Sequence, residues 1–127
     1  MRRLLIATAA VLAVCLGVCT WGLVTMNRIL DDAHALTVKV FAAMEESDRT
    51  AAREGLVELA TVWKEKSELL ELLCDHDDLH DVGEHIIEAR ICLEYTDRED
   101  FYSKVALIGE GIEHIRDEEA LTLANLY

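Results

Sequence analysis

The sequence predicts an all-α protein in which a single N-terminal transmembrane helix is continuous with a small antiparallel bundle of three to four helices. Three observations predict this fold. A run of uncharged residues near the N-terminus is long enough to cross a bilayer. Apolar residues recur at helical spacing through the rest of the chain. Proline is absent and only 6 of the 127 residues are glycine, which is typical of helices joined by short turns. We therefore divide the chain into an anchor, residues 1–27, and an acidic helical bundle, residues 28–127.

The anchor rests on the run from Leu4 to Met26, which contains no charged side chain. At about 1.5 Å per residue, a helix of this length crosses the hydrocarbon of a bilayer. Trp21 lies near its far end, where aromatic side chains favour the membrane interface. A cleaved signal peptide with its site at Ala33-His34-Ala35, or a lipoprotein signal before Cys15 or Cys19, are the alternatives. We expect an uncleaved, single-pass anchor in the cell membrane.

Positive charge sets the predicted orientation of this anchor. Arg2 and Arg3 precede the apolar run, and basic residues favour the cytoplasmic side of a membrane helix. We therefore expect a cytoplasmic N-terminus and an extracytoplasmic bundle domain. Ala9, Ala13 and Gly17 share one helix face at four-residue spacing, which would let two such helices approach closely. Self-association through this face is therefore one further hypothesis.

The first two helices of the bundle follow from the apolar spacing. The anchor is expected to continue without a break into a helix that ends near Glu46. Ser47 or Asp48 then caps a second helix, because short polar side chains accept hydrogen bonds from the first free backbone N–H groups. That second helix is expected to end around Cys74.

Two further helices complete the predicted bundle. The acidic turn 75–78 begins a third helix, which stops near Tyr95, because carboxylates favour the positive end of a helix dipole. Thr96 and Glu99 have the spacing of a capping box for the last helix, which runs close to the C-terminus. Connections of two to four residues make neighbouring helices antiparallel, so we expect an up-down-up-down arrangement.

The bundle domain is strongly acidic. The chain has 12 Lys and Arg and 25 Asp and Glu residues, and only Arg2 and Arg3 precede residue 27, so residues 27–127 carry a net charge of −15. Such a surface repels nucleic-acid phosphates, so we do not expect a nucleic-acid partner. The acidic surface would attract a cationic protein or a metal ion. The alternative is that the acidity only keeps the domain soluble.

The segment 75–88 carries the candidate chemistry. His76 and His80 lie four residues apart, and residues at this spacing share a helix face. Asp77 and Glu84 follow the same spacing, so the four are candidate ligands that would hold a metal ion through imidazole and carboxylate. Histidines among carboxylates also favour their protonated forms, which would make the segment pH-responsive. The alternative is a helix cap with a solvated acidic face, because no His-Glu-x-x-His motif is present.

Four other residues are singled out by type and place. Trp63 is expected to be a core residue where two helices cross, or otherwise part of a partner groove. Asn125 is expected to cap or bond the end of the last helix. His34 and His114 are expected to be surface or capping residues. The chain has no glycine-rich phosphate loop and no Cys-x-x-Cys pair, so we expect neither an enzyme nor a cofactor.

Several short motifs carry a resemblance to a known family. They are Trp63, Asp75-His76-Asp77-Asp78-Leu79, Glu113-His114-Ile115 and Leu123-Ala124-Asn125-Leu126. At these positions the chain resembles the bacterial family described as domain of unknown function 4363, whose members are similar in length and begin with one membrane helix. The resemblance covers nearly the whole chain. Because that family has no established activity, the resemblance implies an architecture and carries over no catalytic residue.

The sequence thus predicts a non-enzymatic, membrane-anchored helical module of the cell envelope. Its expected partners are the lipid bilayer and either an unknown protein or a second copy of the chain. The alternative, from another class of function, is a metal- or pH-responsive sensor built on residues 75–88.

Overall fold

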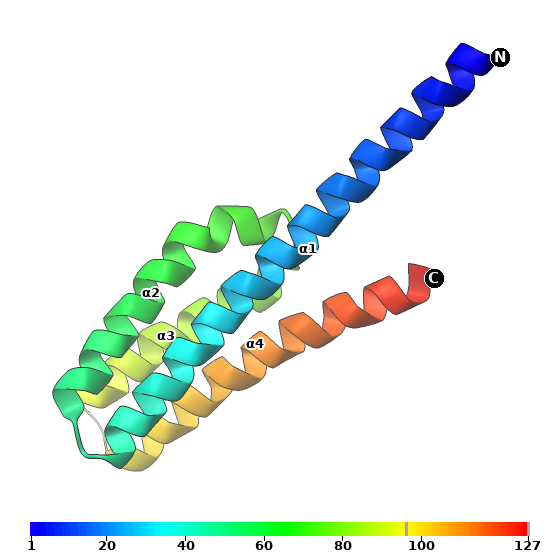
Figure 1. Ribbon diagram of the computed structural model, residues 1–127. Coiled ribbons are helices and arrows are strands. Elements are labelled where there is room, and N and C mark those ends of the chain that lie inside the picture. The colour runs from blue at the N-terminus through cyan, green and yellow to red at the C-terminus, as the bar shows by residue number, and fades with distance from the viewer. Residues whose placement is uncertain (96, 127) are drawn as a thin grey trace.

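The computed structural model describes residues 1–95 and 97–126, and at positions 122, 123, 124 and 126 it describes the backbone alone. Over these residues the chain forms α1 (Arg2–Glu45), α2 (Arg49–Glu71), α3 (His76–Tyr95) and α4 (Arg98–Leu126), with no strand. Helix α1 packs against α2 and α4, and α3 packs against the same two, which gives an up-down-up-down bundle (Figure 1). The predicted all-α fold and bundle are confirmed.

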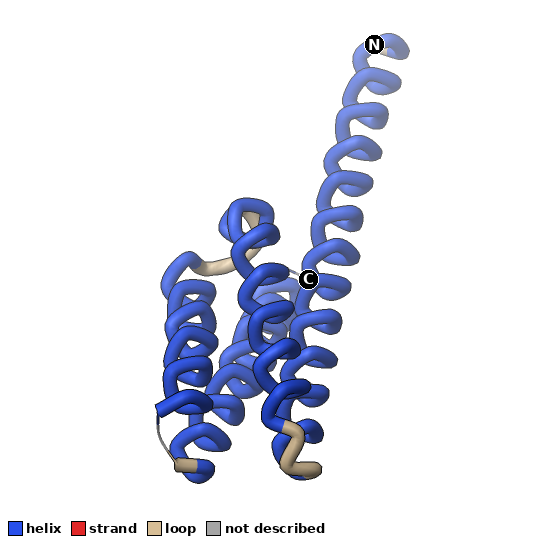
Figure 2. The backbone as a smooth tube through the Cα atoms, turned by 90° about the vertical axis from the view of Figure 1, so that its left-hand side faces the viewer, coloured by secondary structure: helices blue, strands red, loops and turns tan. Residues whose placement is uncertain are grey.

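Helix α1 is continuous, but its two halves have different surroundings. Residues 2–21, here called the stalk, project beyond the bundle and are exposed along their whole length (Figure 2). From Gly22 onward the helix buries one stripe against its neighbours, formed by Gly22, Met26, Ile29, Leu30, Ala33, Thr37, Val40 and Met44. The packed part of α1 therefore begins before residue 27, inside the apolar run that defines the predicted anchor.

The core of the bundle takes aliphatic and aromatic side chains from all four helices. Its largest fully buried members include Leu30, Leu56, Leu59, Leu70, Ile86, Phe101, Ile108 and Ile112. Burial of each such side chain contributes about 1.5–3 kcal/mol relative to exposure. Where α1 and α2 approach most closely, glycine is required: a Cβ on Gly55 would lie 2.7 Å from Cγ2 of Val40.

Aspartates cap the helices that follow the two connections far from the stalk. The Asp48 carboxylate accepts a hydrogen bond from the Ala51 N–H at 3.0 Å, which confirms Asp48 as the cap of α2. Ser47 instead adopts a left-handed conformation with φ of 59°. The predicted capping box names Thr96, which lies outside the described residues. Among those described, Asp97 accepts a hydrogen bond from the Asp100 N–H at 3.1 Å.

Two arginines close this distal end of the bundle, which is the end away from the stalk. The Arg49 guanidinium donates a hydrogen bond to the Leu93 carbonyl near the end of α3. The Arg98 guanidinium donates to the Met44 carbonyl near the end of α1 and lies 5.7 Å from the Tyr102 ring centroid. Cationic groups stabilise the free carbonyls at helix C-termini, so both arginines tie neighbouring helices together.

Candidate functional site

The acidic turn that begins α3 is a helix cap at the stalk end of the bundle. The Asp75 carboxylate accepts a hydrogen bond from the Asp77 N–H at 2.8 Å, and the helix begins at His76. Asp77 and Asp78 lie in the first turn, where a carboxylate is stabilised by the helix dipole. The capping interpretation of this turn therefore fits the structure.

The predicted metal ligands on α3 pair separately instead of converging. His76 Nδ1 lies 3.4 Å from Glu71 Oε1, and His80 Nε2 lies 3.4 Å from Glu84 Oε1. The two imidazole rings stack with their centroids 6.5 Å apart. Asp77 is exposed, and no three ligand atoms of this predicted set meet within the part of the chain that the structure describes. Metal binding by this set stays a prediction.

A different ligand set forms where the start of α3 meets the last turns of α4. One ligand atom each from Asp78, His114 and Glu118 lie within 4.8 Å of one another. His114 Nε2 is 3.6 Å from Asp78 Oδ1 and 3.3 Å from Glu118 Oε1. The antiparallel arrangement brings these helix ends together, and the four-residue spacing on α4 places the imidazole and one carboxylate on one face. An imidazole with two carboxylates is a donor set that divalent transition metals accept.

Crowded negative charge raises proton affinities around this cluster. A hydrogen bond with Asp78, followed by repulsion between the two carboxylates, raises the pKa of Glu118, while His114 opposes the rise. Burial raises the pKa of Glu119. Burial, with smaller contributions from Glu119 and Asp78, raises the pKa of the Cys74 thiol to about 11, so this half-buried cysteine stays protonated at neutral pH. A divalent cation bound here would relieve the repulsion between the carboxylates.

His114 was expected at the surface or in a cap, and its pairing with Asp78 and Glu118 was not predicted. The sequence signal for half of this set is the His114-x-x-x-Glu118 spacing on the last helix, which repeats the spacing of His76 and His80. Only the pairing of α3 with α4 places Asp78 against that face. Periodicity within one helix does not reveal which residue of another helix completes a set.

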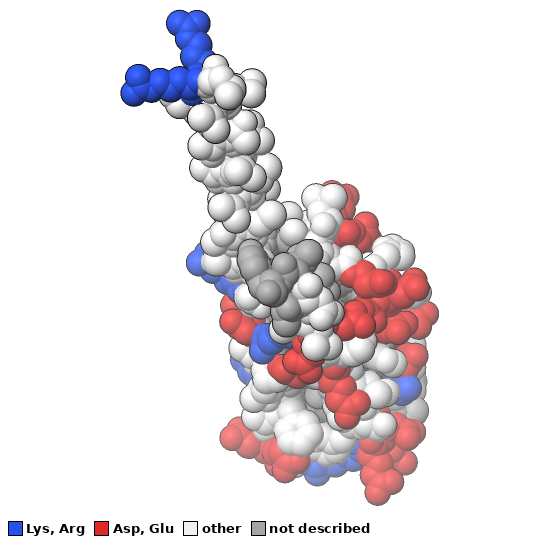
Figure 3. All heavy atoms as spheres, turned by 90° about the vertical axis from the view of Figure 1, so that its right-hand side faces the viewer, with Lys and Arg blue, Asp and Glu red and all other residues white. Residues whose placement is uncertain are grey.

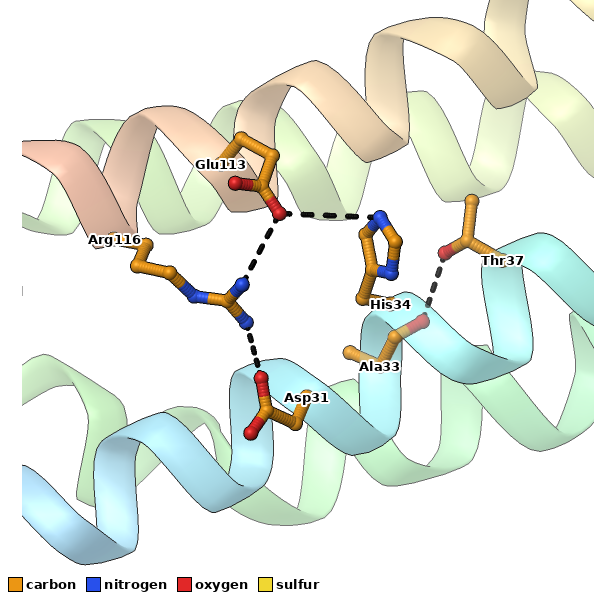
Figure 4. Close-up of polar contacts among 6 residues, drawn as sticks. All are labelled: Asp31, Ala33, His34, Thr37, Glu113 and Arg116. Atoms are coloured by element: carbon orange, nitrogen blue, oxygen red, sulfur yellow. Dashed lines mark hydrogen bonds and ion pairs between the residues drawn. The ribbon is translucent and has the colours of Figure 1, made fainter.

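Beside this cluster, a polar network joins α4 to α1 just below the stalk. Arg116 lies between two carboxylates, at 2.5 Å from Asp31 on α1 and 3.2 Å from Glu113 on its own helix (Figure 4). Glu113 also lies 3.9 Å from Nε2 of His34. Deeper in the interface, the buried Thr37 hydroxyl donates to the Ala33 carbonyl at 2.8 Å. The contacts of Arg116 with Asp31 and of Glu113 with His34 join α4 to α1, and they place His34 at the surface as predicted, whereas the Thr37 hydrogen bond lies within α1.

The surface between α2 and α3 contains a groove with Trp63 in its floor. The groove has a volume of about 420 Å³, and the Trp63 indole beneath it is 5% exposed. The indole N–H donates to the Leu79 carbonyl at 3.2 Å, so Trp63 joins the core where α2 and α3 meet, as predicted. Ile87 and Arg90 line this groove and also a second one of about 300 Å³, which continues toward the distal end. The two together form the α2–α3 groove.

Large apolar side chains stand exposed along the α2–α3 groove. They are Val57 on α2 and Ile87, Ile91 and Tyr95 on α3, with exposed fractions from 45% to 85%. Asn125, which the sequence also singled out, lies exposed in the last turn of α4 at the opposite end of the bundle. The structure thus brings His76 and His80 to the lining of the groove above Trp63, and leaves Asn125 apart from them.

Comparison with known proteins gives a family and no activity. No curated protein and no solved structure matches this chain. A family model described as domain of unknown function (DUF4363) matches residues 20–126, which include the whole bundle and exclude nearly all of the stalk. The match covers the helices that carry the Asp78–His114–Glu118 cluster, the α2–α3 groove and the motifs named in the sequence. The chain therefore belongs to the family of domain of unknown function (DUF4363).

Proposed function

We propose that this protein is a non-enzymatic, membrane-anchored helical module of the cell envelope that binds another protein. The stalk carries this proposal. It is the one described helix segment with the length and apolar composition of a membrane span, and none of its most apolar window is buried in the bundle. An exposed apolar surface of this extent is unfavourable in water and favourable in a bilayer.

The charges at the two ends of the molecule support one orientation. Arg2 and Arg3 lie at the tip of the stalk, and among the charged side chains on the visible face of the bundle Asp and Glu predominate (Figure 3). Basic residues beside a membrane helix favour the cytoplasmic side. The proposed topology therefore has a cytoplasmic N-terminus and a bundle on the outer side of the cell membrane.

The α2–α3 groove is the proposed binding surface. Its exposed apolar side chains run along two antiparallel helices, a shape that accepts the apolar face of a third helix. The domain around it carries a net charge of −15, which favours a partner whose helix has basic residues on its other face. A basic amphipathic helix of a neighbouring envelope protein is therefore the partner that this surface fits.

Site-specific photo-cross-linking in cells tests this proposal. A photoreactive amino acid at Ile87, which is 58% exposed in the groove, is expected to capture a distinct protein. The same amino acid at Val38, which is 54% exposed on α1, is the matched control and is expected to give background only. Equal products at both positions would contradict the groove. Capture of a second copy of this chain would replace the proposed partner with a homodimer.

A C-terminal reporter completes the test, because cross-linking does not report topology. A reporter enzyme that is active only outside the cytoplasm is expected to be active on this chain. A fluorescent protein that folds only in the cytoplasm is expected to stay dark. The reverse pattern would overturn the orientation assigned from Arg2 and Arg3 and would move the partner search into the cytoplasm.

A second candidate function is a metal-responsive module, favoured by the converging ligand atoms of Asp78, His114 and Glu118. Ligand that binds only the folded state raises the melting temperature. Zinc is therefore expected to raise the melting temperature of the wild-type chain in detergent and to leave His114→Ala unchanged. His80→Ala, which removes an imidazole of similar exposure, is the control and is expected to keep the zinc response. A wild-type chain that ignores zinc would remove this candidate.

A further inference from the structure

The part of α1 that is free of the bundle is shorter than the apolar run. Although the run extends from Leu4 to Met26, its last residues pack against the bundle. Gly22 is buried, and a Cβ there would lie only 3.1 Å from Cδ2 of Leu73 in the turn that follows α2. This turn thus lies against α1 beside residues that the sequence assigns to the membrane anchor.

The free part of the stalk does not fill a bilayer by itself. The segment from Leu4 to Trp21 spans about 27 Å at 1.5 Å per residue. The hydrocarbon of a bilayer is about 30 Å thick, and tilting a helix increases the number of residues that it requires. The boundary of the bilayer hydrocarbon on the bundle side therefore falls at Gly22 or just beyond. At this point the turn that follows α2 packs against α1.

Apolar groups lie exposed at the stalk end of the bundle. Leu72, in the turn between α2 and α3, is 82% exposed although it adjoins the packed Leu73. The end of α4 reaches the same end of the bundle (Figure 1). On α4, Leu121 is 64% exposed, and the sequence has no charged residue from there to the end of the helix. Core packing does not account for either exposed leucine.

We propose that the bundle makes a second contact with the bilayer, in which Leu72 and Leu121 insert into the interfacial layer beside the stalk. This inference rests on the proposed membrane anchoring. The continuous backbone of α1 fixes the distance between bilayer and bundle, so the lipid surface is the occupant that already lies against these residues. The bundle is thereby held close to the membrane instead of standing away from it.

The acidic residues next to Leu72 determine which lipid fits. Asp75 caps α3, Asp77 and Asp78 lie in its first turn, and Glu118 and Glu119 lie on the neighbouring end of α4. Carboxylates repel anionic headgroups. The contact is therefore strongest on a zwitterionic surface, where the leucines enter the interface and the carboxylates remain in the hydrated headgroup layer.

Lipid photo-cross-linking in the full chain tests the contact. A diazirine amino acid is placed singly at positions 12, 72 and 95, and each protein is reconstituted in phosphatidylcholine vesicles. Position 12 reports the stalk, position 72 the proposed contact, and position 95 the distal end, where Tyr95 is 85% exposed. Lipid adducts are expected at 12 and 72, with those at 72 several-fold above those at 95. Because all three side chains are exposed, none of these probes disturbs the core.

The three positions separate the two proposals. Adducts at 12 with only the level of position 95 at 72 would overturn the second contact and leave the anchor intact. No adducts at 12 would overturn the anchor and the contact together. In a further arm, phosphatidylglycerol vesicles are expected to lower the adducts at 72 and to leave those at 12 unchanged. An equal or higher yield at 72 in these vesicles would contradict the role assigned to the carboxylates.

Discussion

The two halves of α1 share one backbone helix and differ in almost every other respect. In the stalk, apolar residues occupy all faces and are exposed, whereas residues 22–45 bury one apolar stripe against α2 and α4 and leave only a few large apolar side chains, such as Val24 and Val38, exposed. Both halves are helical, so helix formation itself does not distinguish them. The difference lies in the distribution of apolar groups around the axis, which suits a lipid surrounding in one half and a protein core in the other.

The largest expected effect is on the free energy of unfolding, when one leucine in each half of α1 is truncated to alanine. Leu30→Ala removes a side chain that is 0% exposed and is expected to lower the free energy of unfolding by about 2–5 kcal/mol. Leu12→Ala, at a site that is 59% exposed, leaves the unfolding of the bundle unchanged. Urea denaturation of both variants in mild detergent, followed by circular dichroism, measures the difference. Equal losses would mean that the stalk also packs in a protein core.

A charged residue introduced into the stalk tests whether the stalk lies in a bilayer. Leu12→Arg is expected to raise the apparent free energy of membrane insertion by about 3 kcal/mol, because a guanidinium at the centre of a bilayer is poorly solvated. The protein should then shift from the membrane fraction to the soluble fraction in flotation assays. Val38→Arg, at an exposed site in the bundle half of the same helix, should remain with the membrane. Loss of both from the membrane would contradict the division at Gly22.

Glycine substitutions sharpen the comparison at smaller magnitude. Gly55→Ala places a Cβ 2.7 Å from the branched side chain of Val40 and is expected to destabilise the bundle by about 1–3 kcal/mol, partly offset by better helix propensity. Gly17→Ala in the stalk meets nothing within 4 Å and is expected to cause no loss of bundle stability. Adding Val40→Ala to Gly55→Ala should recover part of the loss in thermal unfolding. A Gly55→Ala protein as stable as wild type would show that the α1–α2 contact adjusts freely.

The smallest effects concern two carboxylates whose pKa values are shifted in opposite directions, Glu119 at the stalk end and Glu88 farther along α3. Burial raises the pKa of Glu119, so its ionisation opposes folding once the pH exceeds the pKa of the folded state. Glu119→Gln is therefore expected to stabilise the protein at pH 7.5 by no more than about 0.5 kcal/mol, and the gain should vanish near pH 4. Glu88→Gln is the opposite case, because a hydrogen bond from Lys104 lowers the pKa of Glu88. It should cost stability at pH 7.5, and the cost should disappear as the pH falls. Melting temperatures of both variants across this range check the two signs.

Helical periodicity and cap chemistry predicted most of the fold. The ends of α1 at Glu45 and of α3 at Tyr95 lie within one residue of the predicted ends, and Asp48 caps α2 as one of the two predicted candidates. These features depend on residues close together in the chain. The second helix was expected to end around Cys74, but α2 ends at Glu71 and leaves this half-buried cysteine in the turn.

The candidate sites were less accessible to sequence reasoning. The segment 75–88 was singled out as chemically dense, yet among the residues that the structure describes it contributes Asp78 alone to the converging set, with His114 and Glu118 supplied by α4. The α2–α3 groove likewise depends on how far apart two helix surfaces lie. The sequence alone also assigns Gly22 to the apolar run, and only the structure shows that it packs against Leu73. Each of these features depends on inter-helix geometry that local spacing does not encode.

The uninterrupted passage of α1 through Gly22 has a mechanical consequence. A loop or a proline at this point would let the bundle swivel, whereas a helix resists twisting and bending over this distance. Rotation of the stalk about its axis must therefore turn the bundle by the same angle. A neighbouring helix that binds one face of the stalk therefore also determines which face of the bundle points toward that neighbour. The rotational orientation of the α2–α3 groove about the axis of α1 is thus set by contacts of the stalk.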